Sequence, residues 1–444
     1  MKSRFVRALL LTTLLTFGAA APSSAGGAGP ADAYRFSTPL RVGFKSGDDW
    51  EPAIAADRFG HQYLLYKHYD INGGGTCRGC DLHVLVQRSD DGGRTWTAPR
   101  PIAPGKVDGG EYDSQIVVDS LDGRTVWASF LQGEDSQIAV VKSTDFGMTW
   151  SKPRIVSGPG RGFDKDSLAV RGSTIAVAYD DELNSFAAVS TDGGVHWTVH
   201  QTFAGTDQYN LPLSAGAGID SQGDLFFTWD SWDAAGAADE NGNGPVTLWV
   251  SRSTDGGTTW KRTVLDVSGA PYPCTDCGFA FLSAQMTMAI GSDDAVYLLW
   301  NSTPGSVDNG PERIYFARSI DHGRTYSPAR DVSTAALGVE HSFPALAVGR
   351  APGDVRLAWM DMRTGAWNVI ARRSDDGGRH LGPEVQLSRF AAGYPYISHA
   401  GFDLPYGDYM QLAVDAAGLT QAAWGEGPSY AGPGNIWLAH QLGG

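Results

Sequence analysis

The chain contains 444 residues, among them 57 glycines, 14 tryptophans and 16 tyrosines, and it carries a formal net charge of −15. This acidity argues against partners that are themselves polyanions, namely nucleic acids and anionic membrane surfaces. Abundant glycine together with aromatic residues favours short strands joined by tight turns, which is typical of an all-β repeat fold.

The first 25 residues are predicted to be a secretory signal peptide. Its basic start is followed by an apolar stretch, residues 8–21, that is too short to form a stable membrane span. We interpret residues 26–33 as a short linker and 34–444 as the folded domain. Loss of the signal would leave 31 Lys and Arg against 49 Asp and Glu, a charge of −18. We therefore expect a secreted, extracellular monomer without a membrane or nucleic-acid partner.

An octet that recurs six times is the strongest pattern in the remaining sequence. Its copies start 54, 47, 63, 66 and 55 residues apart, at Ser89, Ser143, Ser190, Ser253, Ser319 and Ser374. Each copy holds an Asp and a Gly that suit a tight hairpin, and five of the six end in Trp or Tyr. We predict that these aspartates are turn residues and not catalytic groups. The spacing fits one four-stranded propeller blade per copy.

A second pattern, of two apolar strands joined by a turn, precedes each octet and occurs once more near the end of the chain. This seventh copy, residues 410–424, is followed by a third strand over 435–441 but by no fourth strand. Residues 34–42 resemble the fourth strands of the other repeats, so the N-terminal strand can complete the last blade and remove two open sheet edges. The sequence thus predicts a single seven-bladed β-propeller in which 36–42 pairs with 436–440. Six blades plus an irregular tail is the alternative.

Ligand sites in propellers are expected on the face opposite the octet hairpins, where loops enter the inner strands and leave the second strands. The residues entering the inner strands include Trp50, Glu51, Asp113, Lys165, Asp166, His341, Asp408 and Tyr409. The residues that follow the second strands include Lys67, His68, Tyr69, Asp230, Trp232, Asp361, Arg363 and Glu426. This mixture of carboxylates and aromatic rings suits acid/base chemistry on a sugar, or a bound calcium ion. Hydrogen bonding between blades is the structural alternative.

The four cysteines form two CxxC pairs in loops of this same face, Cys77 with Cys80 and Cys274 with Cys277. In an exported chain such pairs favour disulfides. A zinc or copper site built from both pairs is the alternative, although the two pairs belong to the first and fifth repeats.

The octet matches the Asp-box pattern Ser-x-Asp-x-Gly-x-Thr-Trp, and over nearly the whole mature chain the sequence resembles the bacterial sialidase-like (BNR-repeat) propellers. The resemblance implies a glycan ligand. Sialidases hold a substrate carboxylate with three arginines and use a Tyr–Glu pair and an acidic Asp. Here Glu51 stands where the first arginine would be expected. By this resemblance Tyr409 and Glu426 correspond to the Tyr–Glu pair, and Asp113 or Asp361 to the acid.

Three functions remain open at this point. The first is a sialidase-like glycoside hydrolase that is not a strict sialidase, whose catalytic candidates are Glu51, Asp113, Asp361, Asp408, Tyr409 and Glu426. Its substrate contacts would come from Trp50, Lys67, His68, Tyr69, Asp230, Trp232, His341 and Arg363. The second is a glycan-binding propeller without catalysis. The third is a polysaccharide lyase that uses His68 or His341 with Tyr69 or Tyr409. No cofactor is expected, with structural calcium as the exception.

Overall fold

A computed structural model describes residues 34–44, 47–69, 80–105, 109–134, 136–158, 163–181, 183–205, 209–234, 244–271, 283–388, 407, 409–427 and 434–443. The signal peptide and linker predicted for residues 1–33 lie outside this range. Within it, no helix has the length and apolar character needed to cross a membrane.

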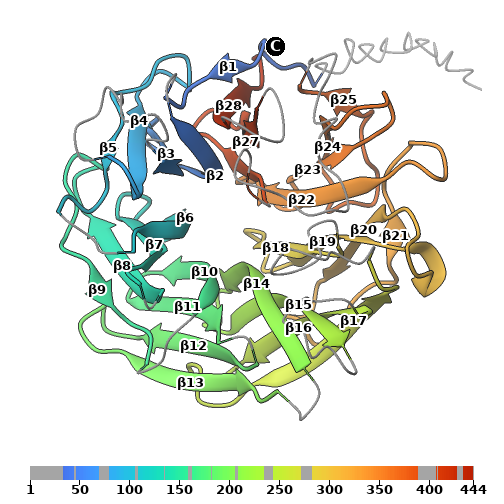
Figure 1. Ribbon diagram of the computed structural model, residues 1–444, viewed down its shortest axis with the longest axis horizontal. Helices are drawn as coiled ribbons and strands as arrows, with labels where there is room; N and C mark the ends of the chain where they lie inside the picture. The colour runs from blue at the N-terminus through green and yellow to red at the C-terminus, as the bar shows by residue number, and fades with distance from the viewer. Residues whose placement is uncertain are drawn as a thin grey trace, which may run out of the picture. The chain divides into compact units, whose positions relative to one another are not determined.

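Seven four-stranded antiparallel sheets are arranged as blades around a central axis (Figure 1). Blades one and two contain β2 (Asp48–Ala56), β3 (Gln62–Tyr69), β4 (His83–Ser89), β5 (Arg100–Pro101) and β6 (Glu111–Val118), β7 (Val126–Gln132), β8 (Gln137–Ser143), β9 (Arg154–Ile155). Blades three and four contain β10 (Asp164–Arg171), β11 (Thr174–Asp180), β12 (Ser185–Ser190), β13 (Thr198–Phe203) and β14 (Tyr209–Ile219), β15 (Leu225–Ala234), β16 (Val246–Ser253), β17 (Lys261–Ser268).

Blades five and six contain β18 (Met286–Ile290), β19 (Val296–Ser302), β20 (Arg313–Ser319), β21 (Arg330–Asp331) and β22 (His341–Val348), β23 (Val355–Asp361), β24 (Asn368–Ser374), β25 (Val385–Gln386). Blade seven contains β26 (Gln411–Val414), β27 (Thr420–Glu426), β28 (Asn435–His440) and β1 (Leu40–Arg41). A short 3-10 turn, η1 (Pro304–Ser306), follows β19.

The N-terminal strand closes the ring, as the sequence predicts. In Figure 1, β1 lies beside β28 although the two strands come from opposite ends of the chain. Leu40 pairs with Leu438 and Arg41 with Trp437, and a further bridge joins Phe36 to Gln441. Seven blades are therefore present, and the six-bladed alternative is wrong. The N-terminal strand thus covers the edge of β28 that the last repeat would otherwise leave unpaired.

The octets form the hairpins that join third to fourth strands, with their aspartates accepting hydrogen bonds as predicted. In the first copy, Asp91 Oδ1 accepts from the backbone N–H groups of Arg94 and Thr95, at 3.0 and 2.9 Å, and Oδ2 accepts from the Thr95 hydroxyl at 2.6 Å. The hydrogen bonds from Thr95 are the main reason that the pKa of Asp91 falls to about 2. The Trp96 indole N–H then donates to the Gly93 carbonyl at 3.1 Å. The aspartate contacts recur in the later copies, with a histidine in place of the threonine at His196 and His380, so these aspartates stabilise turns.

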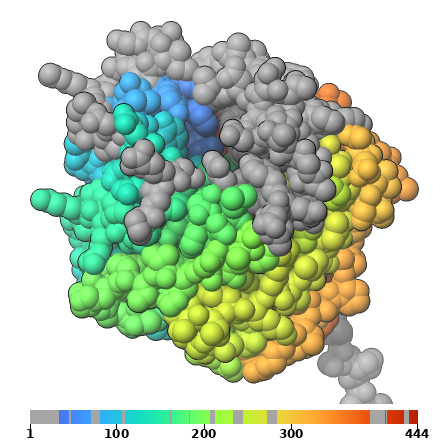
Figure 2. All heavy atoms as spheres, turned by 60° about the horizontal axis from the view of Figure 1, so that its bottom comes forward, coloured from blue at the N-terminus to red at the C-terminus, as the bar shows by residue number. Residues whose placement is uncertain are grey.

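The hydrophobic core lies between the blades and not inside any one of them. Each of seven buried clusters draws its side chains from two adjacent blades, including the first and the last. Second strands such as β19 and β23 are buried along their whole length because neighbouring blades cover both faces. Figure 2 shows the outside of the ring, where colours follow chain order from cyan through green to orange. The inner strands are thereby held with their first residues around one opening.

Candidate functional site

Residues of the inner strands surround a cavity of about 240 Å³ on the propeller axis. All seven inner strands contribute to its wall. Its apolar part includes Ile54, Leu168, Met288 and Leu412. Its charged residues are Asp113, Lys165, Asp166 and Asp230, and the ring of Tyr409 also lines it. We call this cavity the channel site.

A β-bulge near the start of the inner strand aims the side chains at this opening in several blades. The register shifts between Trp50 and Ala53 in β2, and at the same place in β6, β10 and β22. In each case a non-glycine residue in the bulge takes a positive φ, namely Glu51, Asp113, Lys165 and Phe343, at 56°, 45°, 43° and 55°. Such residues cost roughly 1–3 kcal/mol each and gather at functional sites, where bulges redirect side chains. Three of the four are ionisable, and they belong to three successive blades.

Asp113, Lys165 and Asp166 form the central charged group of the channel site. Lys165 Nζ lies 2.8 Å from Asp113 Oδ1, and this ion pair joins blade two to blade three. Asp166 is 2% exposed and accepts a short hydrogen bond from the Ser129 hydroxyl. Its other oxygen, Oδ1, has no hydrogen-bond partner among the described residues. Burial raises the pKa of Asp166 well above its usual range, and the nearby charge of Asp113 adds to this rise.

Beside this group, the cavity wall also carries uncharged polar side chains. The Tyr409 hydroxyl donates to the Ser114 carbonyl at 3.4 Å, and Lys165 Nζ lies 5.7 Å from the centre of the Tyr409 ring. The Gln411 amide donates to Gln115 at 2.7 Å across the ring of blades. Channel walls of this kind offer several hydrogen-bonding groups to a polar ligand.

Glu51 and Lys67 extend the site towards the rim of blade one. Glu51 is 4% exposed and packs against Gly407. A side chain at position 407 would clash, because its Cβ would lie only 2.4 Å from Glu51 Cγ. Lys67 Nζ lies 4.5 and 4.1 Å from the ring centres of Tyr69 and Tyr112, and Tyr69 stacks on Trp50 at 5.1 Å. The predicted residues Trp50, Glu51, Lys67 and Tyr69 are therefore brought together, although none of the four is among the described residues that line the channel site.

The Lys67 ammonium is an unusually costly group in this cluster. It is 1% exposed, and its Nζ has no hydrogen-bond partner among the described residues. Burial lowers its pKa to about 7, against the opposing effect of nearby carboxylates, of which Glu111 and Glu51 act most strongly. The amount by which Lys67 lowers the free energy of unfolding therefore depends on pH.

We expect Lys67→Met to stabilise the fold at pH 6 to 7, with a gain that shrinks towards pH 9. The folded pKa of about 7 lies below the unfolded value of roughly 10.4, so the unfolded chain binds the additional proton between these values. The destabilisation caused by Lys67 is thus complete below pH 7 and lost as the pH approaches 10. Urea unfolding at pH 6, 7, 8 and 9 measures it, with exposed Lys261→Met as the control. A difference that does not vary with pH would contradict the assignment.

A second charged cluster, between blades five and six, holds several residues that the sequence placed at the mouth. Asp361 is fully buried and accepts two hydrogen bonds from the Arg363 Nε and one from the Trp359 indole. Arg363 also donates to Glu384 at 2.5 Å. His341 is fully buried, 2.7 Å from the Ser333 hydroxyl. The described lining of the channel site contains none of Asp361, Arg363 and His341.

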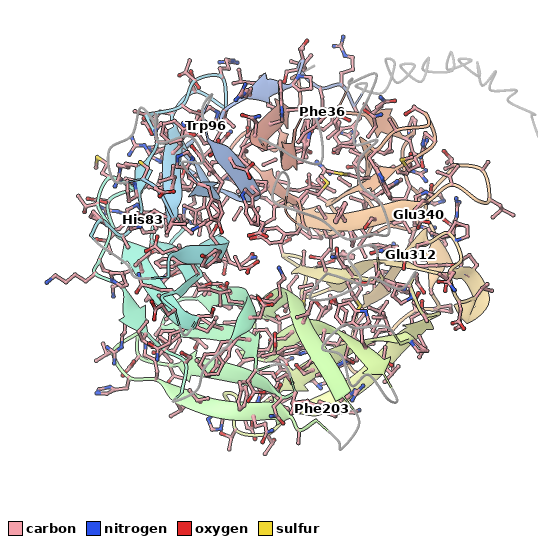
Figure 3. The ribbon with its side chains drawn as sticks, viewed as in Figure 1. Phe36, His83, Trp96, Phe203, Glu312 and Glu340 are labelled. Carbon is pink, nitrogen blue, oxygen red and sulfur yellow. The ribbon has the colours of Figure 1, made fainter. Side chains whose placement is uncertain are left out.

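Two glutamates in the same region, the buried Glu312 and the half-buried Glu340, also have raised pKa values. The labels in Figure 3 show Glu312 and Glu340 close together, and Glu340 Oε1 accepts from the Glu312 backbone N–H at 2.8 Å. Burial raises the pKa of Glu340 to about 7, and burial and Glu340 together raise that of Glu312. The cluster thus joins two blades through a dense set of polar contacts.

The remaining predicted residues have these positions. His68 is buried and lies 2.7 Å from Asp49 Oδ1, with its ring against Phe44. Glu426 accepts from the Trp424 indole at 3.3 Å, and burial raises its pKa to about 8. Trp232 is fully buried in the core between blades four and five. Neither His68 nor Glu426 is among the described residues that line the channel, so the contacts of both favour a structural role.

Several predicted residues cannot be placed. Asp408, Cys77, Cys274 and Cys277 lie outside the described residues, while Cys80 is buried and disulfide-bonded. The pairing of the two CxxC motifs stays a prediction. Across the described part of the chain, no group of three or more His, Cys, Asp or Glu side chains has the arrangement of a metal site. The expectation of calcium likewise stays a prediction.

The sequence did not single out Asp166 and Lys165 as catalytic residues, although it placed both at the mouth. Their position in the repeat could have identified them. Lys165 and Asp166 lie in the bulge at the start of β10, and the corresponding bulges of β2 and β6 hold Glu51 and Asp113. The sequence does not predict the burial of Asp166 or the ion pair of Lys165 with Asp113 of the preceding blade.

Comparison with known proteins gives partial matches. A xyloglucanase, Xgh74A of Acetivibrio thermocellus, is 28% identical over 221 residues, which cover 44% of this chain and 24% of the relative. A sialidase of Bacteroides fragilis is 29% identical over 157 residues, 27% of this chain and 29% of the relative. The matched segments thus span less than a third of these curated relatives. No family model matches the chain.

Among solved structures, an ulvan lyase of a polysaccharide lyase family has a TM-score of 0.52 with 10% sequence identity. The superposition covers 90% of this chain and 95% of the lyase. At this identity the likeness demonstrates a shared propeller fold and carries no information about the reaction.

Proposed function

We propose that this chain, a member of the sialidase-like β-propeller superfamily, is a secreted, monomeric glycoside hydrolase whose acid and partner carboxylate are Asp166 and Asp113. The observation that carries the proposal is the contrast between these two aspartates on the channel wall. One is buried with an oxygen that lacks a partner, and the other is held beside an ammonium group. Two carboxyl groups with opposite environments suit the two roles that glycoside hydrolysis requires.

In this mechanism Asp166 is the proton donor. Its raised pKa favours the protonated form, and its partnerless Oδ1 is the atom available to a glycosidic oxygen in the cavity. After proton transfer the new carboxylate would keep its hydrogen bond from Ser129 and gain the attraction of Lys165. These contacts lower the cost of the charge that forms when the bond breaks.

Asp113 supplies the negative charge that the reaction needs. Its Oδ1 lies 2.8 Å from the Lys165 ammonium, and the bulge directs it into the cavity. From there it can stabilise the positive charge that develops on the sugar ring, or activate the attacking water. Tyr409 lines the same wall and offers a face against which a ring can pack.

The names of the curated relatives support a glycan substrate, because a xyloglucanase and a sialidase both act on glycans. Sialidases are expected to carry their first substrate-binding arginine at the position where this chain has Glu51. This difference supports an activity other than strict sialidase action. For the lyase alternative, the two histidines considered as bases are both buried and bonded away from the cavity.

Substitution of Asp113 tests this function. We expect Asp113→Asn to lower kcat/KM on aryl glycosides by a factor of about 10² or more, since it removes the charge but preserves the size of the side chain. Asp331→Asn is the matched control, because it also removes one member of an ion pair, with Arg313 at 2.9 Å, on the outer strand of blade five. The control should stay within a few-fold of the wild type. Glycan binding by the wild type without any product would instead identify a binding propeller.

A further inference from the structure

The size of the channel site limits what can enter it. Its volume is about 240 Å³. This is below the range of about 300–1,000 Å³ that is usual for sites of drug-sized ligands. The cavity therefore suits one sugar unit, with any longer chain left outside the described wall.

The charges on the wall are unevenly distributed. Asp113, Asp166 and Asp230 come from three successive blades and all line the cavity. Lys165 also lines it, but its ammonium is already engaged by Asp113 at 2.8 Å. A ligand carboxylate or sulfate would have to compete with Asp113 for this cation while lying near the carboxylate of Asp230, and Asp166, whose raised pKa favours the neutral acid, adds no positive charge to attract it. Like charges about 5 Å apart in such surroundings reduce affinity by roughly a hundredfold.

The uncharged groups of the wall are matched to hydroxyl groups. Ser214 is 5% exposed, and its Oγ has no hydrogen-bond partner among the described residues, as is also true of Asp166 Oδ1. Both residues line the cavity. A buried polar atom without a partner is costly, so a ligand that donates to one and accepts from the other recovers that cost. Sugar hydroxyl groups do both, and Met288 and Leu412 provide apolar surface for the carbon face of a ring.

We infer that the sugar unit held in the channel site is uncharged, which excludes sialic acids, uronic acids and sulfated sugars from this position. The inference rests on the proposed function and adds the substrate class to it. Recognition would depend on hydroxyl contacts to Asp166 and Ser214, while Asp230 and Asp113 would reject an anionic ring.

Paired probes that differ in one group decide the matter. 4-Nitrophenyl glucoside and galactoside are compared with the corresponding glucuronide and galacturonide, in which only the primary alcohol is replaced by a carboxylate. We expect kcat/KM to be at least a hundredfold higher for a neutral probe than for its acidic partner. The expected rate on the neutral probe varies little between 20 and 500 mM NaCl, since no ion pair forms with the ligand.

A variant and a binding measurement separate the two proposals. Asp230→Asn should raise the acidic-to-neutral ratio about tenfold, because one repulsive charge is removed. Saturation-transfer NMR with the methyl glycosides of the same pairs measures binding without turnover. Preference for the uronide, in rate or in binding, would overturn the inference and leave the hydrolase intact. Binding of a neutral sugar without hydrolysis would uphold the inference and reject the hydrolase, and failure of every probe to bind would reject both.

Discussion

Asp166→Asn is expected to lower kcat by a factor of about 10²–10⁴ on glycosides with poor leaving groups. Asn has the size of Asp and can still accept the hydrogen bond from Ser129, but it has no proton to donate. The loss should shrink as the leaving group improves, because a 2,4-dinitrophenolate departs without protonation. Steady-state rates across a series of aryl glycosides measure this dependence.

The pH profile provides an independent check on the same residue. A general acid acts in its protonated form, so wild-type activity should fall as the pH rises through the raised pKa of Asp166. That alkaline limb should be absent from the residual activity of Asp166→Asn. The fold should be at least as stable as the wild type near neutral pH, because a buried carboxyl group is replaced by an amide that never ionises. A loss of rate that is independent of the leaving group would show that Asp166 does not donate the proton.

The fold could be predicted from sequence because its determinants are local and repeated. Each octet specifies its own hairpin through contacts within eight residues, such as those of Asp91 with Ser89, Arg94 and Thr95. The missing fourth strand of the last repeat indicated where the N-terminal strand belongs, and the pairing of Leu40 with Leu438 confirms this position. Neither inference needed knowledge of how the blades pack.

The candidate site was harder to predict from the sequence, because its chemistry depends on contacts between blades. Sequence position correctly places Asp113, Asp230 and Tyr409 at the channel. It places Asp361 by the same rule, yet that carboxylate is fully buried against Arg363, a partner only two residues away. Whether a residue after the second strand faces a ligand or an arginine is decided by side-chain packing, which the repeat pattern does not encode.

Ring closure helps to hold the strained bulges of the channel site in place. A positive φ at Glu51, Asp113 and Lys165 works against the local fold, and the neighbouring blades must hold these strands in place. The inter-blade clusters provide that restraint only if every blade is complete. The stability of the last blade is therefore coupled to the geometry of the channel.

We expect Phe36→Ala to destabilise the protein by about 3–5 kcal/mol, as is usual for the loss of a buried phenylalanine. Phe36 is 7% exposed, packs edge-on against Tyr34 at 4.9 Å, and belongs to the core between blades six and seven (Figure 3). Its removal weakens the only described strand that joins the two ends of the chain into one sheet.

Phe59→Ala is the matched control, because Phe59 is 54% exposed at the turn between β2 and β3. Denaturant unfolding monitored by tryptophan fluorescence measures both variants, and the control should lose much less stability than Phe36→Ala. Equal losses would mean that the N-terminal strand adds little to closure. Because the aspartates of the channel are positioned by the ring as a whole, Phe36→Ala should also lose activity at a lower temperature than the control. Simultaneous loss of structure and rate on heating would link closure directly to the site.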